Sequence, residues 1–242
     1  MLRSLFFFGV QMSKRKKKAT ETAQNNHFSL KEIRPLTPNQ SDTFDSFKAG
    51  KNLLLHGSPG SGKTFLSIYL ALDEVLNKNR YKQVVIIRSV VPSRDMGHLP
   101  GSVKEKSAVY EEPYKIICDD LFGRGDGYDI LKTKKLVNFT TTSFLRGITL
   151  DNSIVIVDEV QNMAFHECNT VMTRIGENCK VIFCGDFRQS DFTNHLEREG
   201  VIKFMQILNK MDSFGHIEFT RDDIVRSGLV REYLITKETL NL

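Results

Sequence analysis

Apolar residues in this chain occur in short, nearly continuous runs that alternate with longer segments of helical spacing. The runs predict β-strands at residues 52–56, 83–88, 153–157, 180–184 and 216–220, with a further short strand at 136–140. Helical spacing predicts helices at residues 64–77, 105–121, 164–174, 195–210 and 225–236. Several strands are apolar at every position, which is typical of a parallel sheet buried on both faces. The pattern therefore predicts an α/β fold with a mainly parallel sheet sandwiched by helices.

Charge divides the chain into two parts. The 242 residues carry a net charge of +5, and 40% of them are hydrophobic, which is enough for one sizeable domain. Residues 1–18 hold six basic and no acidic residues, which leaves 28 basic and 29 acidic residues in the remainder. We therefore expect a basic, disordered tail at residues 1–27 and a folded domain at 28–242. Two roles for the tail stay open, namely binding nucleic acid and serving as a solvated end.

The beginning of the chain contains no recognisable export signal. Its apolar run ends at Val10 and is too short to cross a membrane, and lysines follow where a signal peptide would be cleaved. We expect a cytoplasmic protein without a membrane partner, and Met12 is an alternative translation start to Met1. The four cysteines form no C-x-x-C pair, so we expect no zinc site.

Residues 57–64 fit the phosphate-binding loop pattern G-x-x-x-x-G-K-[S/T], between a predicted strand and a predicted helix. In such a loop, backbone N–H groups and the positive end of the helix hold phosphate oxygens. The side chain of Lys63 would reach the β- and γ-phosphates, and the Thr64 hydroxyl would hold Mg²⁺. The predicted ATP-binding residues of the loop are Gly57, Ser58, Pro59, Gly60, Ser61, Gly62, Lys63 and Thr64.

Two carboxylates end the buried strand at 153–157. Asp158 is the expected second Mg²⁺ ligand, commonly through a water molecule. Glu159 follows it and is the expected general base, because hydrolysis needs an acceptor for the proton of the attacking water. A nucleotide switch without turnover has no need of this second carboxylate.

Four further residues are candidates for the same site. Gln189 follows another predicted strand and is expected near the γ-phosphate or the attacking water. Gln40 lies before the first strand, and its amide offers both a donor and an acceptor to adenine, although a helix cap with an exposed glutamine is an equal alternative. Arg226 and Arg146 are candidates for the arginine that stabilises charge in phosphoryl transfer.

Taken together, these motifs resemble those of PhoH-family ATPases, which are similar to one core domain of superfamily-one helicases. The resemblance runs from about Leu36 to Val230 and includes the phosphate loop and the segments 88–91, 97–106, 144–150, 158–162, 185–189 and 223–230. The chain differs from the usual family pattern at Ser89, where the family more often has proline, and at Ser227-Gly228, where it often has His-Pro.

The resemblance implies a RecA-like P-loop NTPase that binds and hydrolyses ATP with Mg²⁺. It also implies a homo-oligomeric ring, expected to be hexameric, and an action on RNA or another single-stranded nucleic acid. A single domain would need a neighbour's arginine, supplied in trans, to complete its site. The connection at residues 89–106, with its basic side chains, is a candidate contact for the nucleic-acid backbone, and a structural clamp or a contact between subunits is an equal alternative.

Two other functions stay open at this point. A thymidine-type nucleoside kinase also combines a phosphate loop with an Asp-Glu-x-Gln string, but such kinases typically carry paired cysteines that are missing here. The second alternative is a scaffold ring that binds ATP without hydrolysing it, and Glu159 argues against this function.

Overall fold

One six-stranded sheet organises the domain. The computed structural model describes residues 28–89, 103–187 and 195–240, so the predicted tail at 1–27 lies outside the described residues. All strand pairs are parallel, and the strand order is β3-β2-β4-β5-β1-β6. The strands are β1 Asn52–Gly57, β2 Gln83–Arg88, β3 Val137–Thr141, β4 Ser153–Asp158, β5 Lys180–Gly185 and β6 Phe214–Phe219. The predicted fold class and all six predicted strands are confirmed.

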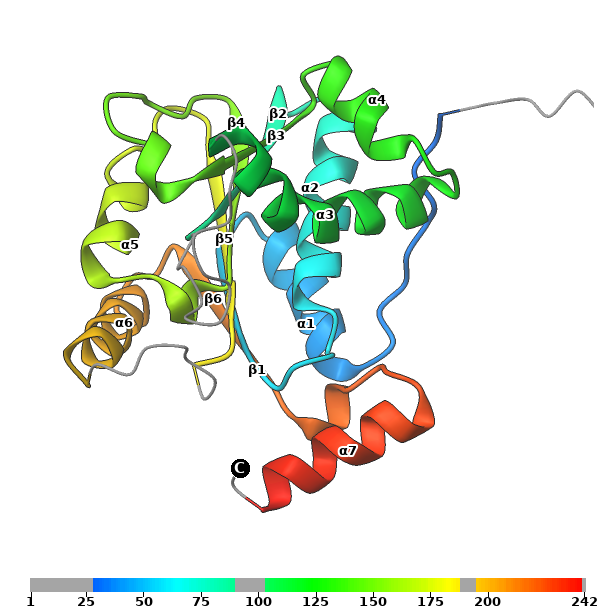
Figure 1. Cartoon of the computed structure of the whole chain (residues 1–242), viewed down its shortest axis with the longest axis vertical. Coiled ribbons are helices and arrows are strands. Elements are labelled where there is room, and N and C mark those ends of the chain that lie inside the picture. The colour runs from blue at the N-terminus through cyan, green and yellow to red at the C-terminus, as the bar shows by residue number, and fades with distance from the viewer. Residues whose placement is uncertain (1–27, 90–102, 188–194, 241–242) are drawn as a thin grey trace, which may run out of the picture.

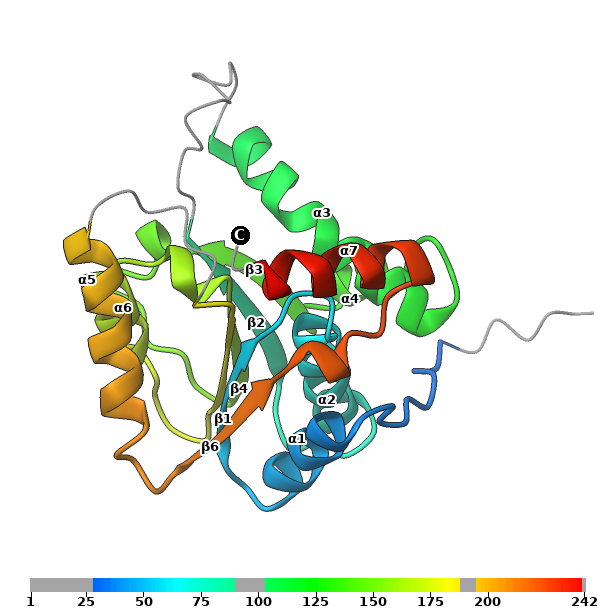
Figure 2. The same cartoon turned by 90° about the horizontal axis from the view of Figure 1, so that it is seen from below.

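Helices cover both faces of this sheet. Helices α1 to α4 lie on one face and α5 and α6 on the other, whereas α7 lies on the outside of the domain (Figures 1 and 2). The helices are α1 Pro38–Lys48, α2 Lys63–Leu76, α3 Val103–Phe122, α4 Gly127–Thr133, α5 Phe165–Met172, α6 His195–Leu208 and α7 Gly228–Thr239. No helix in the described ranges is both long and apolar enough to cross a bilayer.

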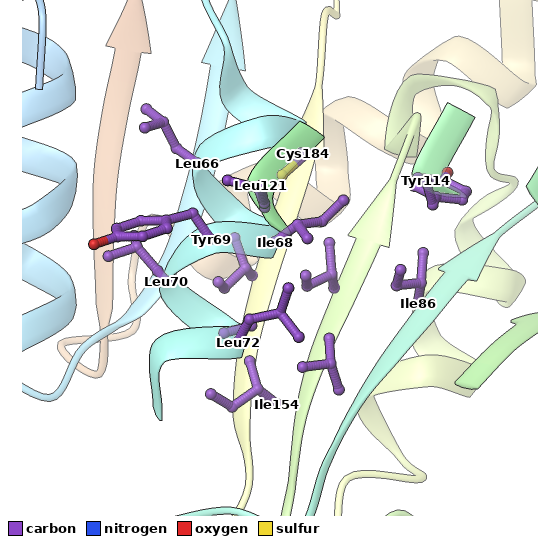
Figure 3. Close-up of a cluster of buried hydrophobic side chains, with 14 of the residues drawn as sticks. Leu66, Ile68, Tyr69, Leu70, Leu72, Ile86, Tyr114, Leu121, Ile154 and Cys184 are labelled. Atoms are coloured by element: carbon purple, nitrogen blue, oxygen red, sulfur yellow. The ribbon is translucent and has the colours of Figure 1, made fainter. Parts of the chain in front are cut away.

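The continuous apolar strands have a direct structural reason. Successive side chains of a strand point to opposite faces, and both faces of this sheet are covered. In β4, Ile154 and Ile156 pack in the core under α1 to α4, whereas Val155 and Val157 pack in the core under α5 and α6. Figure 3 shows part of the first core, in which Leu72 of α2 lies near Ile154 and Tyr114 of α3 lies near Ile86.

Three helical segments differ from the sequence prediction. Helix α1 is not among the predicted helices, although a helix cap with an exposed glutamine was an alternative for Gln40. Thr37 is the residue that caps it, by accepting a hydrogen bond from the Gln40 backbone N–H, Pro38 occupies its first turn, and Gln40 is 3% exposed. Helix α4 follows the turn predicted at 122–127 and was also not predicted. Helix α7 begins at Gly228 rather than at 225. Arg221–Asp223 form a separate 3₁₀ turn, η4, and the Val225 backbone N–H donates to the Gly60 carbonyl at 3.1 Å.

Asp223 ties this turn to the beginning of α1. Its carboxylate accepts hydrogen bonds from Thr37 Oγ1 at 2.5 Å, Asn39 Nδ2 at 2.7 Å and the Thr220 backbone N–H at 2.8 Å. The side chain is 2% exposed, and these donors lower the pKa of Asp223 against the opposing effect of burial. The segment that follows, with Val225 and Arg226, is thereby held next to the phosphate loop.

Candidate active site at the carboxyl ends of the strands

The phosphate loop joins β1 to α2 at the carboxyl edge of the sheet, where ligands of open parallel sheets bind. Gly57, Gly60 and Gly62 have φ values of 107°, 74° and 87°, a region that favours glycine. At Gly57 a Cβ atom would lie 2.0 Å from the Phe219 carbonyl oxygen, so the loop also needs glycine for close packing. Among the residues that the structure describes, no side chain caps the beginning of α2, so its first N–H groups are available to an anionic ligand.

Lys63 lies across its own loop. Its ammonium donates to the carbonyl oxygens of Gly57 and Ser58, both at 2.8 Å, and to Ser61 Oγ at 3.3 Å. Burial lowers the pKa of Lys63, while the nearby carboxylates, Asp186 foremost, act in the opposite direction. The charge of Lys63 is therefore held at the mouth of the loop by carbonyl oxygens that a phosphate group can replace.

Asp158 connects the two motifs predicted from the sequence. Its Oδ1 accepts a hydrogen bond from Thr64 Oγ1 at 2.9 Å, and its Oδ2 accepts one from Tyr114 Oη at 3.0 Å. Burial raises the pKa of Asp158 to about 6, and repulsion from Glu159 adds to this, whereas the two hydroxyl donors and Arg88 act to lower it. The two oxygen ligands predicted for Mg²⁺ are thus brought into direct contact.

Glu159 occupies a special backbone position just after β4. Its φ and ψ of 54° and 43° are left-handed, which is costly for a residue with a Cβ and is concentrated at functional sites. Gln161 Nε2 donates to the Glu159 carboxylate, and Gln161 Oε1 accepts from the Asp186 backbone N–H at 3.0 Å. Gln161 can approach this closely because β5 ends in Gly185, where a Cβ atom would lie 2.6 Å from Gln161 Oε1.

A cavity of about 570 Å³ joins these groups. Its charged and polar lining includes Lys63, Thr64, Asp158, Glu159, Asp186 and Arg226, and its apolar lining includes Ile33, Leu36, Ile116, Ile117, Phe65 and Val225. A charged end together with apolar walls suits a ligand that carries phosphates and a flat base.

Gln40 lines the cavity with its amide already engaged. It is 3% exposed, its Oε1 accepts from the Leu36 backbone N–H at 2.8 Å, and its Nε2 donates to the Ser61 carbonyl at 3.0 Å. Base recognition by Gln40 stays a prediction, and in this structure its amide braces the phosphate loop.

The two candidate arginines occupy different places. Arg226 lies against the phosphate loop of its own chain, since a Cβ atom on Gly60 would lie 2.9 Å from Arg226 Cγ. Arg146 lines a separate hollow of about 290 Å³ with Thr142, Ser143, His166, Glu167 and Thr170. Glu167 holds this hollow together, because its carboxylate accepts from Ser89 Oγ at 3.0 Å, from Thr142 Oγ1 and from the Ala164 backbone N–H at 2.9 Å.

Three residues of this site have no role that their place in the sequence predicts. Tyr114 and Gln161 hold the two carboxylates, and Asp186 is the acidic neighbour that most raises the pKa of Lys63. The position of Asp186 after a third buried strand was the signal that could have identified it. The predicted Gln189 lies outside the described residues.

Comparisons with known proteins agree with this geometry. The profile of the family described as PhoH-like protein matches residues 32–237. A PhoH-like protein of Bacillus subtilis is 29% identical over 205 residues, which cover 84% of this chain and 63% of the relative. Protein PhoH of Escherichia coli K12 is 30% identical over 180 residues, which cover 74% of this chain and 50% of the relative. The chain therefore spans about half to two thirds of the length of these relatives.

Among solved structures, the large terminase of a thermophilic bacteriophage, in complex with ADP, has a similar fold. The TM-score is 0.50 at 15% sequence identity, and the match covers 82% of this chain and 49% of the terminase. At this identity the likeness supports the P-loop, RecA-like fold alone.

Proposed function

This chain belongs to the PhoH-like protein family, and from that premise we propose that it binds ATP with Mg²⁺ and hydrolyses the nucleotide. We further propose that hydrolysis drives an action on RNA or another single-stranded nucleic acid, within a homo-oligomeric ring of six chains.

One observation carries the ATPase proposal. The hydroxyl of Thr64, at the end of the phosphate loop, donates to the carboxylate of Asp158, at the end of a strand two positions away in the sheet. A loop that merely turned the chain would not need a buried carboxylate from a distant strand at this point. Hydroxyl and carboxylate oxygens are also the ligand type that Mg²⁺ prefers, so the residues present fit this ion.

Each group of the site then has a role. Lys63 and the first N–H groups of α2 would hold the phosphate oxygens, and Thr64 with Asp158 would hold the ion. When bound, Mg²⁺ neutralises charge on the β- and γ-phosphates. A water molecule attacks the γ-phosphorus, its proton passes to the Glu159 carboxylate, and the bond to the bridging oxygen of ADP breaks. Gln161, which donates to the Glu159 carboxylate, would hold that carboxylate in place for this step.

Arg226 is suited to act on the nucleotide of its own chain, because it already lies beside Gly60. The arginine predicted to act in trans is then Arg146, whose hollow is separate from the cavity of its own chain. In a head-to-tail ring, Arg146 of one chain would reach the active site of the neighbouring chain.

Exposed apolar residues near the cavity support assembly. Helix α7 contacts the phosphate loop through Glu238, whose carboxylate accepts from Ser58 Oγ, yet none of its residues is buried. Leu229 is 80% exposed and Tyr233 is 64% exposed on this helix. Such side chains next to a catalytic cavity are suitable contacts for another chain.

The nucleic-acid part of the proposal rests on the family's resemblance to helicase core domains. The connection at residues 89–106, which is predicted to contact the nucleic acid, lies mostly outside the described residues, because the description resumes at residue 103.

The test is the ATPase rate of the full chain with and without poly-RNA and single-stranded DNA, beside light scattering for the number of subunits. Lys63→Ala should abolish hydrolysis, and Lys48→Ala, at an exposed lysine that ends α1, serves as the matched control. An ATPase rate that is the same with and without RNA or single-stranded DNA would refute the motor function. It would not contradict the proposed ATPase activity. Formation of thymidine monophosphate from thymidine and ATP would instead favour the nucleoside kinase.

A further inference from the structure

Tyr114 connects the middle of α3 to the carboxylate predicted to hold the metal. The side chain is fully buried, and its ring packs in the core 5.6 Å from the ring of Phe139 (Figure 3 shows Tyr114 near Ile86). Its hydroxyl leaves this apolar surrounding to donate to Asp158 Oδ2 at 3.0 Å.

The two oxygens of Asp158 are engaged by donors from different elements. Thr64, on α2, donates to Oδ1, and Tyr114, on α3, donates to Oδ2. With a donor on each oxygen the carboxylate plane cannot rotate freely. Without the Tyr114 hydroxyl, Asp158 Oδ2 would lose this hydrogen bond while staying buried. The carboxylate would then be held by Thr64 alone and could rotate about its bond to Cβ.

A second contact places α3 at the same edge of the sheet. Tyr110 lies one helical turn before Tyr114, and the guanidinium of Arg88 lies 5.6 Å from its ring centroid. Arg88 ends β2 and is the register partner of Asp158 on β4. Helix α3 therefore contacts two neighbouring strand ends through two tyrosines on one face.

We propose that Tyr114 is a positioning residue for the metal site: its phenol fixes the orientation of the Asp158 carboxylate that Mg²⁺ binding requires. This inference rests on the proposed function. Mg²⁺ demands nearly ideal octahedral geometry, so a carboxylate that can rotate binds it less well. Loss of partners that orient metal ligands typically lowers metal affinity or activity about 10- to 100-fold.

A plainer explanation must be separated from this one, because any buried tyrosine tends to find a hydrogen-bond acceptor. Tyr128 provides the comparison within the same chain. It is 2% exposed, and its hydroxyl donates to the Glu111 carboxylate, which does not line the cavity. Tyr128→Phe therefore removes the same kind of bond at a distance from the metal site.

The experiment measures binding of a fluorescent ATP analogue to the full chain, from EDTA through increasing Mg²⁺. Tyr114→Phe should bind the analogue as the wild type does in EDTA and need about tenfold more Mg²⁺ for half-maximal tightening. Tyr128→Phe should stay within twofold of the wild type in both conditions. In an Asp158→Asn background, Tyr114→Phe should have no further effect on the Mg²⁺ dependence.

Equal Mg²⁺ dependence of Tyr114→Phe and Tyr128→Phe would overturn the proposal, as would a loss of affinity that is already complete in EDTA. A wild type that binds no nucleotide would refute the proposed function itself, which is a different result. If Tyr114→Phe does not fold, 3-fluorotyrosine at position 114 retains the hydrogen bond. Its ¹⁹F resonance should shift on addition of Mg²⁺ and ATP, the same label at Tyr128 should not respond, and a silent label at 114 would overturn the proposal.

Discussion

Asp158→Asn should stabilise the folded protein in the absence of metal, although it removes a residue of the candidate active site. Burial raises the pKa of this carboxyl from an ordinary value of 3.8 to about 6. The difference of roughly two pKa units corresponds to about 3 kcal/mol that the folded chain loses by keeping Asp158 ionised. Asparagine has nearly the same shape and carries no charge, so it avoids this loss.

The sign follows from proton binding. Between about pH 4 and pH 6 the folded chain keeps a proton on Asp158 that the unfolded chain has released, so stability decreases by about 3 kcal/mol as the pH rises through this window. Above pH 6 the decrease in unfolding free energy that Asp158 causes no longer changes with pH. Asparagine has one acceptor oxygen where the carboxylate has two, so either the Thr64 or the Tyr114 hydroxyl would lose its acceptor. The loss of this hydrogen bond costs about 1 kcal/mol. The expected net gain at pH 8 is therefore about 1 to 2 kcal/mol.

Urea unfolding in EDTA at pH 5 and pH 8 measures this difference for the wild type and for Asp158→Asn. Asp45→Asn, at an exposed position of α1, controls for the loss of a negative charge as such. With Mg²⁺ and ATP present the order should reverse, because a ligand that binds the folded state stabilises it. The reasoning fails if Asp158→Asn is less stable than the wild type at pH 8 and its unfolding free energy has the same pH dependence. Burial of the ionised carboxylate would then not destabilise the folded chain.

Three further outcomes are expected. Glu159→Gln should bind ATP normally and hydrolyse it at least ~100-fold more slowly in a steady-state phosphate assay, and a rate near that of the wild type would exclude Glu159 as the base. Gly185→Ala should lower the unfolding free energy by about 1 to 3 kcal/mol and slow turnover, because the new Cβ atom would displace Gln161. Gly125→Ala is the control: a Cβ atom there would meet no atom within 4 Å, so stability and turnover should stay unchanged. Mixing Lys63→Ala chains with Arg146→Ala chains should restore hydrolysis, and mixing them with Arg226→Ala chains should not; the opposite pattern would show that Arg226 is the arginine supplied in trans.

Local sequence determined the strands and the phosphate loop. The strands could be predicted because a sheet buried on both faces needs apolar side chains at successive central positions, as at Val84–Ile87 in β2 and Ile154–Val157 in β4. The loop could be predicted because its geometry depends on glycines that are close together in sequence. The sequence pattern also predicts that Asp158 and Glu159 end a buried strand, and the structure brings Asp158 into contact with Thr64. Their roles toward Mg²⁺ and the attacking water stay predictions.

Only the tertiary structure decided which groups hold these residues in place. Tyr114 occupies an apolar face of α3 and looks from its spacing like an ordinary core residue, and it meets Asp158 because β4 lies next to β2 in the sheet. Gln161 reaches Glu159 and Asp186 because β5, a neighbour of β4, ends in glycine. Arg226 reaches Gly60 through the anchoring of Asp223 on α1, a contact across more than 180 residues of chain. Residue type and spacing determine what a short segment can form, whereas the order of strands follows from burying all the apolar surfaces together. The partners of the candidate catalytic groups follow from that strand order.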